Sequence, residues 1–162
     1  MLFRSGAYIA RIKQYDGPLH AVILVAPDAA HQAAASDARR KAGKALGPLD
    51  GVPILLKDNI DVMGMPTTAG SYGLAQNMPA QDSGIAGRLR AAGAVLLGKV
   101  NMNQFAGLRT SMGLLGSTVG GTPHNPYDLA RTPGGSSSGS AIGTAVSFAA
   151  ATLGSDTTGS II

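Results

Sequence analysis

The sequence predicts an α/β protein in which helices pack in layers against a β-sheet. Short apolar runs typical of buried strands alternate along the chain with longer segments of helical character, which is the pattern of this fold class. Hydrophobic residues make up 44% of the 162 residues and charged residues 14%, so the chain can bury a substantial core. Its length suits a single domain.

Three elements are expected in the first part of the chain. Residues 6–15 (GAYIARIKQY) carry apolar side chains on one face and predict a short amphipathic helix. Residues 19–26 (LHAVILVA) are rich in β-branched residues, which favours a buried strand. An Ala-rich helix should follow from Pro27 to about Lys44, because proline suits the first helical turn.

The middle of the chain predicts two more strands with a helix between them. Residues 51–60 (GVPILLKDNI) indicate a buried strand that runs into a loop. A helix capped by Asp82 or Ser83 should end at Gly93, since glycine commonly terminates helices. Residues 94–100 (AVLLGKV) then predict another buried strand.

Small residues dominate the last part of the chain. Residues 133–140 (PGGSSSGS) have the composition of a flexible linker, but they lead directly into residues 140–153, which predict one buried apolar helix. Such a helix is unstable alone in water, which favours a packed loop at its N-terminus over a tether. Residues 154–162 (GSDTTGSII) form a second Gly- and Ser-rich turn. A helix of about fourteen residues spans roughly 20 Å, so the chain must fold back if the two turns are to meet.

Composition argues against several classes of protein. The net charge is +4, but the basic residues are scattered, aromatic residues are only 4% and Trp is absent, which disfavours nucleic-acid binding. Cysteine is absent, which excludes disulfides and thiol catalysis. The first residues lack a signal-peptide core, and no apolar run approaches the 18 or so residues of a membrane span. We therefore expect a soluble, cytoplasmic protein without membrane contact.

Three motifs together carry a resemblance to a known family. PGGSSSGSA followed by GSDTTGSII is similar to the signature of the amidase signature family of serine hydrolases. A lysine after a strand and before Asp-Asn, in GVPILLKDNID (51–61), matches the third family element. Residues 65–71, 88–106 and 124–137 also resemble the corresponding segments of family members, so the resemblance covers nearly the whole chain. It implies a mixed β-sheet flanked by helices.

The resemblance implies a Ser–Ser–Lys catalytic triad. Its lysine falls on Lys57, its bridging serine on Ser136 and its nucleophile on Ser160, with 24 residues between the two serines. A serine is a weak nucleophile unless a base accepts its proton, and a lysine can do so only when burial lowers its pKa. From its own pattern Lys57 is an ordinary lysine at a strand end. The resemblance also implies a cis peptide between Gly135 and Ser136.

The second Gly- and Ser-rich turn is expected to stabilise the reaction intermediate. Backbone N–H groups of Thr157, Thr158, Gly159 and Ser160 would form the oxyanion hole. The implied reaction is attack on an amide carbonyl, release of ammonia or an amine, and hydrolysis of an acyl-serine, with a small-molecule amide as substrate and no metal or organic cofactor. Thr158 stands where many members have Gly, and Ile162 where many have Arg.

Length separates this chain from the family. Members continue well beyond the nucleophile, so residues 1–162 are interpreted as an incomplete amidase signature domain whose C-terminal part is missing. We expect it to be poorly soluble or inactive alone, and to associate with a complementing C-terminal portion or with a second copy as a homodimer. A loop around Arg109 to Met112 is expected to form one wall of the site.

Two other functions remain open on the sequence. The chain could belong to the amidase subunit of an aspartyl/glutamyl-tRNA amidotransferase, which shares the signature and passes ammonia to a charged tRNA through a partner subunit. It could also be an inactive fragment or a non-catalytic anion-binding module, with GGSSSGS at a helix N-terminus. The missing Lys-[ST] ending of a P-loop counts against the latter.

Overall fold

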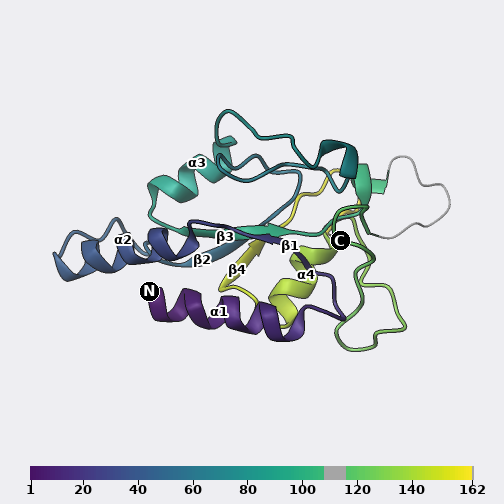
Figure 1. Cartoon of the computed structure of the whole chain (residues 1–162), viewed down its shortest axis with the longest axis horizontal. Coiled ribbons are helices and arrows are strands. Elements are labelled where there is room, and N and C mark those ends of the chain that lie inside the picture. The colour runs from purple at the N-terminus through teal and green to yellow at the C-terminus, as the bar shows by residue number, and fades with distance from the viewer. Residues whose placement is uncertain (108–115, 162) are drawn as a thin grey trace.

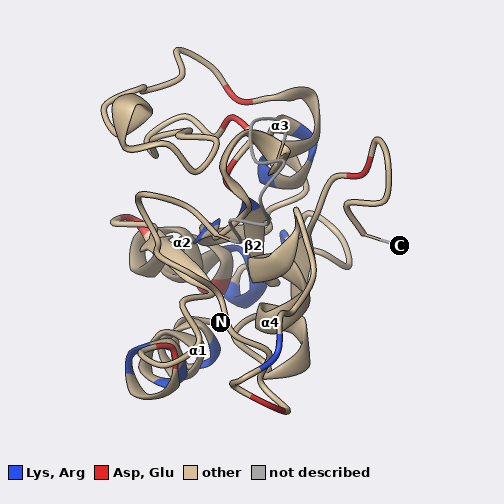
Figure 2. Cartoon of the chain, turned by 90° about the vertical axis from the view of Figure 1, so that its right-hand side faces the viewer, with Lys and Arg blue, Asp and Glu red and all other residues tan. Residues whose placement is uncertain are grey.

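A four-stranded mixed sheet forms the centre of the molecule, in a computed structural model that describes residues 1–107 and 116–161. Helices cover both of its faces: α3 lies on one side, and α1 and α4 lie on the other (Figures 1 and 2). Two short 3₁₀ turns, Tyr72–Leu74 and Gln104–Gly107, lie in the loops. The helices and strands are α1 (Leu2–Tyr15), β1 (Val22–Val25), α2 (Ala29–Lys41), β2 (Pro53–Lys57), α3 (Gly84–Ala91), β3 (Val95–Val100), α4 (Ser138–Ala145) and β4 (Ala151–Leu153).

The strand order is β1-β3-β2-β4, with β2 parallel to both of its neighbours and β1 antiparallel to β3. All residues of β2 and β3 are buried, as expected for central strands covered on both faces. Two lysines, Lys57 and Lys99, are nevertheless part of these strands and are buried with them. The mixed sheet flanked by helices is thus confirmed, and each buried lysine needs a partner to offset its desolvation.

Most expected elements occur near their predicted positions. The helix expected to end at Gly93 begins after Ser83, whose side chain accepts a hydrogen bond from the N–H of Ala86. Gly93 adopts a φ of +80° directly after the helix, a conformation that favours glycine. The sequence signals for this helix therefore identified both its start and its end.

The long helix predicted over residues 140–153 is wrong in its second half. Helix α4 ends at Ala145, Ser147 adopts a left-handed φ of +57°, and the buried ring of Phe148 anchors the reversal. The chain then returns as β4, which pairs in parallel with β2. This reversal brings the second Gly- and Ser-rich turn back beside the N-terminus of α4, so the two turns meet.

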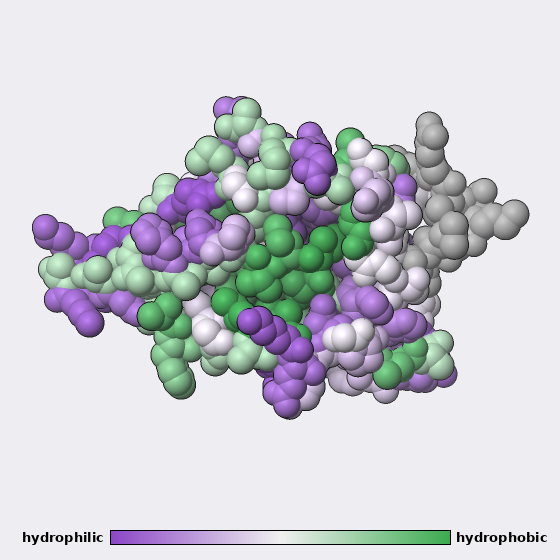
Figure 3. Space-filling model, viewed as in Figure 1, coloured by the Kyte–Doolittle hydropathy of each residue, from purple (hydrophilic) through white to green (hydrophobic). Residues whose placement is uncertain are grey.

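The two edge strands of the sheet are β1 and β4. Each residue of β1 is only partly buried. On the face of the molecule seen in Figure 1, where β1 is the edge strand, the space-filling view shows an apolar patch at the centre (Figure 3). Strand β4 is the last strand at the opposite edge of the sheet. Among the described residues, no helix has the length and apolar character needed to cross a membrane.

Candidate active site

Lys57 is the last residue of β2, and its amino group is held in a buried polar site. The residue is 1% exposed, and Nζ donates to the hydroxyl of Ser136 (2.8 Å), the hydroxyl of Ser137 (2.9 Å) and the carbonyl of Ser155 (3.1 Å). Burial lowers the pKa of Lys57 to about 8, while the negative charge of Asp156 acts in the opposite direction. Lys57 is therefore mostly protonated near physiological pH, but a minor fraction, roughly one tenth at pH 7, is neutral.

The two serines expected from the sequence lie in line with this lysine. The Ser136 hydroxyl donates to the Ser160 hydroxyl at 2.9 Å, so Lys57, Ser136 and Ser160 form one continuous chain of hydrogen bonds. The peptide bond between Gly135 and Ser136 is cis, as expected. The N–H of Ser137 donates to the Ser160 carbonyl (3.1 Å), which ties the two turns together.

Hydrogen bonds to the segment after β3 fix the first Gly- and Ser-rich turn, residues 133–140. The N–H of Gly139 donates to the carbonyl of Asn101 at 3.0 Å, and the N–H of Asn103 donates to the carbonyl of Ser136 at 3.2 Å. Asn101 is fully buried, and its side chain donates to the carbonyls of His20 and Gly121. The segment after β3 thus holds the start of α4 and the bridging serine in place.

Backbone N–H groups of the second turn are partly engaged with a carboxylate. Asp156 accepts from the N–H of Gly159 and from the N–H of Ile161, each at 2.7 Å. Thr157 and Thr158 belong to the same exposed turn. The Gly159 N–H can therefore serve an oxyanion only by exchanging its present hydrogen bond.

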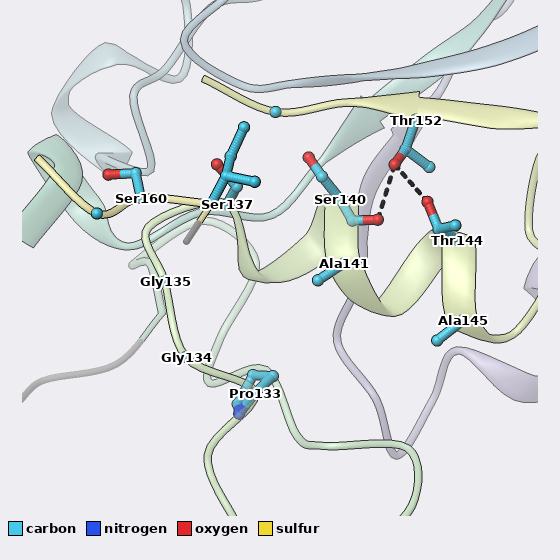
Figure 4. Close-up of a pocket in the computed structure, with 13 residues that line it drawn as sticks. Pro133, Gly134, Gly135, Ser137, Ser140, Ala141, Thr144, Ala145, Thr152 and Ser160 are labelled. Carbon is cyan, nitrogen blue, oxygen red and sulfur yellow. Dashed lines mark hydrogen bonds between the residues drawn. The ribbon is translucent and has the colours of Figure 1, made fainter. Parts of the chain in front are cut away.

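A cavity of about 660 Å³ has Ser160 among the residues that line it (Figure 4). Its 13 lining residues come from the two turns, α4 and β4, and none of them is charged. Within it, the hydroxyl of Thr152 donates to the carbonyl of Ser140 (2.8 Å) and hydrogen bonds to the hydroxyl of Thr144 (2.7 Å). The walls suit an uncharged group. The expected wall from Arg109 to Met112 lies outside the described residues, as does Ile162.

A buried ion pair lies on the other face of the sheet from Lys57. Lys99 is paired with Leu56 in the register, so its side chain faces away from that of Lys57. Its amino group lies 3.2 Å from the Asp58 carboxylate, and both side chains are 1% exposed. Asp58 also accepts hydrogen bonds from the N–H groups of Thr68 and Gly70, so the pair fixes the loop beside β2 and β3.

Several residues that shape this site have no distinguishing signal in the sequence. Ser137 and Ser155 hold the Lys57 amino group, but they are two serines among many in small-residue runs. Asp156 lies within the GSDTTGSII motif and Asn101 within residues 88–106, but the sequence assigns neither residue the hydrogen bonds that it makes here. Only the folded chain brings these residues together at the site.

Comparisons with known proteins show the family to which the chain belongs. The family model described as Amidase matches residues 6–162, so the chain belongs to the amidase family. A glutamyl-tRNA(Gln) amidotransferase subunit of Salinispora arenicola is 50% identical over 157 residues, which is 96% of this chain and 31% of that relative. The chain thus spans about a third of the length of the curated relatives it matches.

Solved structures of amidases have the same fold over nearly the whole chain. A peptide amidase in complex with the competitive inhibitor chymostatin is 43% identical with a TM-score of 0.96, covering 99% of this chain and 34% of that one. Native peptide amidase from Stenotrophomonas maltophilia is 44% identical with a TM-score of 0.90, covering 93% of this chain and 32% of that one. These matches place the sheet, the helices and the two turns within an amidase fold.

Proposed function

We propose that this chain carries the catalytic centre of an amidase that hydrolyses a carboxylic amide to the acid and ammonia or an amine. The observation that supports this most strongly is the continuous hydrogen-bonded chain from the Lys57 amino group through Ser136 to the Ser160 hydroxyl. A buried lysine with a pKa near 8 at one end and a partly exposed hydroxyl at the other form a base and a nucleophile.

Proton transfer follows from the donors and acceptors around Lys57. When its amino group is neutral, its two N–H bonds donate to Ser137 and to the Ser155 carbonyl, which leaves the lone pair for Ser136. The Ser136 hydroxyl then donates to Lys57 and accepts from Ser160, which reverses the direction of both hydrogen bonds. Deprotonation of Ser160 therefore moves one proton to Ser136 and one from Ser136 to Lys57.

The reaction then proceeds through an acyl-serine. The Ser160 oxygen attacks the amide carbonyl carbon, and N–H groups of Thr157, Thr158, Gly159 and Ser160 stabilise the resulting oxyanion. The C–N bond breaks as the leaving nitrogen takes the proton returned through Ser136. Water then attacks the acyl-serine, delivers its proton along the same chain and releases the acid.

We further propose that a complementing C-terminal portion of the family domain completes the site. Strand β4 stands at one edge of the sheet, and the cavity beside it is bordered by Ile161. The relatives are about three times as long as the part of them that matches this chain. The triad is therefore assigned to this chain, and the remaining walls of the substrate pocket to that portion.

A second candidate is the amidase subunit of a tRNA amidotransferase. The curated relatives named as subunits of glutamyl-tRNA(Gln) amidotransferase are 45–50% identical to this chain, which supports it. In that function glutamine is the amide that releases ammonia, and a partner subunit receives it. Glutamine dependence and copurification with a larger partner would favour this candidate over a hydrolase that acts on peptide or aliphatic amides.

Ammonia release tests both candidates. The chain is assayed alone and mixed with the separately expressed C-terminal portion of a relative, using an amidated peptide, an aliphatic amide and glutamine. We expect ammonia from at least one amide, and none when Ser160 is replaced by alanine. Folded wild-type mixtures that release no ammonia from any of the three would contradict both candidates and favour a non-catalytic anion-binding module.

A further inference from the structure

Asn103 lies between the bridging serine and the segment that follows β3. Its backbone N–H donates to the carbonyl of Ser136 at 3.2 Å, and its side-chain oxygen Oδ1 accepts from the N–H of Gly116 at 3.0 Å. A Cβ added to Gly135 would overlap the Asn103 nitrogen Nδ2, and the next nearest atoms, at 2.9 and 3.0 Å, belong to the same amide group. The Asn103 side chain therefore packs directly against the residue that precedes Ser136.

We propose that Asn103 is a positioning residue, whose side chain holds the Ser136 hydroxyl between Lys57 and Ser160 by restraining Gly135. The proposal rests on the proposed function, because Ser136 has a proton to transfer only if these three residues act as a triad.

The Asn103 side chain can restrain Gly135 because its own position is anchored. The N–H of Gln104 donates to the carbonyl of Gly116 at 2.8 Å, so two hydrogen bonds join Gly116 to residues 103 and 104. Gly116 in turn packs closely against other backbone, since an added Cβ there would collide with the carbonyl oxygen of Gly121. The acceptor Oδ1 is thus fixed, and the amide group of Asn103 cannot rotate away from Gly135 without losing a hydrogen bond.

The bridging serine depends on such a restraint. Its hydroxyl lies 2.8 Å from the Lys57 amino group and 2.9 Å from the Ser160 hydroxyl, and it must stay within reach of both while the two hydrogen bonds reverse. A displacement of about 1 Å would break one of them, and a misplacement of that size can slow a reaction about a hundredfold. Gly135 has no side chain to fix it, so its position depends on what packs against it.

The restraint is tested by amide exchange in the 162-residue chain, corrected for the intrinsic rate of each residue. Asn103→Ala should speed exchange at least about tenfold at two amides, that of residue 103, which donates to Ser136, and that of Ser137, which donates to Ser160. Asn103→Asp keeps an acceptor of the same shape and should keep both rates within about threefold of wild type. Asn77→Ala, which removes another loop amide, one that donates to the carbonyl of Thr67 at 2.8 Å, is the matched control and should change neither rate.

The contact with Gly135 is tested by a compensating substitution. Gly135→Ala places a methyl group against the Asn103 amide, and we expect it to slow fluorophosphonate labelling of Ser160 at least about tenfold. Adding Asn103→Ala removes the colliding atoms, so the double variant should be labelled at least about threefold faster than Gly135→Ala. A double variant that is labelled no faster than Gly135→Ala would show that this contact does not position the serine.

The two readouts separate this proposal from the proposed function. Amide exchange needs no turnover, so a wild-type chain without labelling or ammonia release contradicts the proposed function, while exchange still decides whether Asn103 holds the first turn. Unchanged exchange at Ser137 in Asn103→Ala overturns the positioning role. Circular dichroism checks the folding of each variant, and Asn103→Ser, a smaller change with the same expected direction, replaces Asn103→Ala if the latter does not fold.

Discussion

Replacing Gly139 with alanine would force a methyl group against the backbone that supports the first turn. An added Cβ would lie 2.5 Å from the carbonyl oxygen of Ala21, 2.6 Å from that of Asn101, and closer still to the Asn101 nitrogen. Backbone atoms cannot rotate away as side chains can, so we expect a cost of about 3 kcal/mol. The better helix propensity of alanine returns about 1 kcal/mol, for a net loss of about 2 kcal/mol.

Gly143 provides a matched control in the same helix. An alanine Cβ there would meet the methyl group of Thr152 at 3.3 Å, and Leu55 and Val100 only at 3.8 and 4.0 Å. Because the tight contact with Thr152 offsets the better helix propensity of alanine, we expect a change within about 1 kcal/mol of zero. Urea unfolding followed by circular dichroism measures both variants. With a typical urea slope, Gly139→Ala lowers the midpoint by about 1 M. Equal midpoints for the two variants would refute the close-packing argument.

Three further predictions concern the buried charges and the lysine site. With a pKa of about 8, Lys57 is neutral in roughly one tenth of the molecules at pH 7 and in roughly nine tenths at pH 9. Fluorophosphonate labelling of Ser160 should therefore rise about tenfold between these pH values, and a flat profile would contradict this. Lys99→Met leaves the Asp58 carboxylate buried without its partner and should lower the free energy of unfolding by about 3 to 5 kcal/mol. Adding Asp58→Asn should recover part of that loss in urea unfolding. Ser137→Ala removes one acceptor of the Lys57 amino group and should slow labelling about tenfold, measured against the wild-type chain at the same pH.

The two central strands could be predicted because buried strands have an apolar composition. Residues 51–60 and 94–100 are apolar runs, and they form the two central strands, which are buried throughout. The end of α4 was not predictable, since Ala, Thr and Leu in residues 149–153 fit a buried helix as well as a strand. Pairing of β4 with β2, a contact between distant segments, decides the conformation there.

The positions of the three triad residues could be predicted from the sequence, but the groups that surround the Lys57 amino group could not. The resemblance indicated Lys57, Ser136 and Ser160, and the fold brings these three side chains together. The state of Lys57 depends on groups 80 and 98 residues away, Ser137 and Ser155, which no local pattern connects to it. Asp156 lies within the GSDTTGSII motif, but its hydrogen bonds to the N–H groups of Gly159 and Ile161 are known only from the geometry of that turn.

The most direct test of the proposed triad is the site of covalent modification by a fluorophosphonate probe, mapped by mass spectrometry of peptides from the labelled chain. We expect a single adduct on Ser160, no adduct in Ser160→Ala, and labelling slowed in Lys57→Met at every pH from 7 to 9. Labelling that persists in Ser160→Ala, or that proceeds at the wild-type rate in Lys57→Met, would contradict the assignment of Ser160 as the nucleophile and Lys57 as its base.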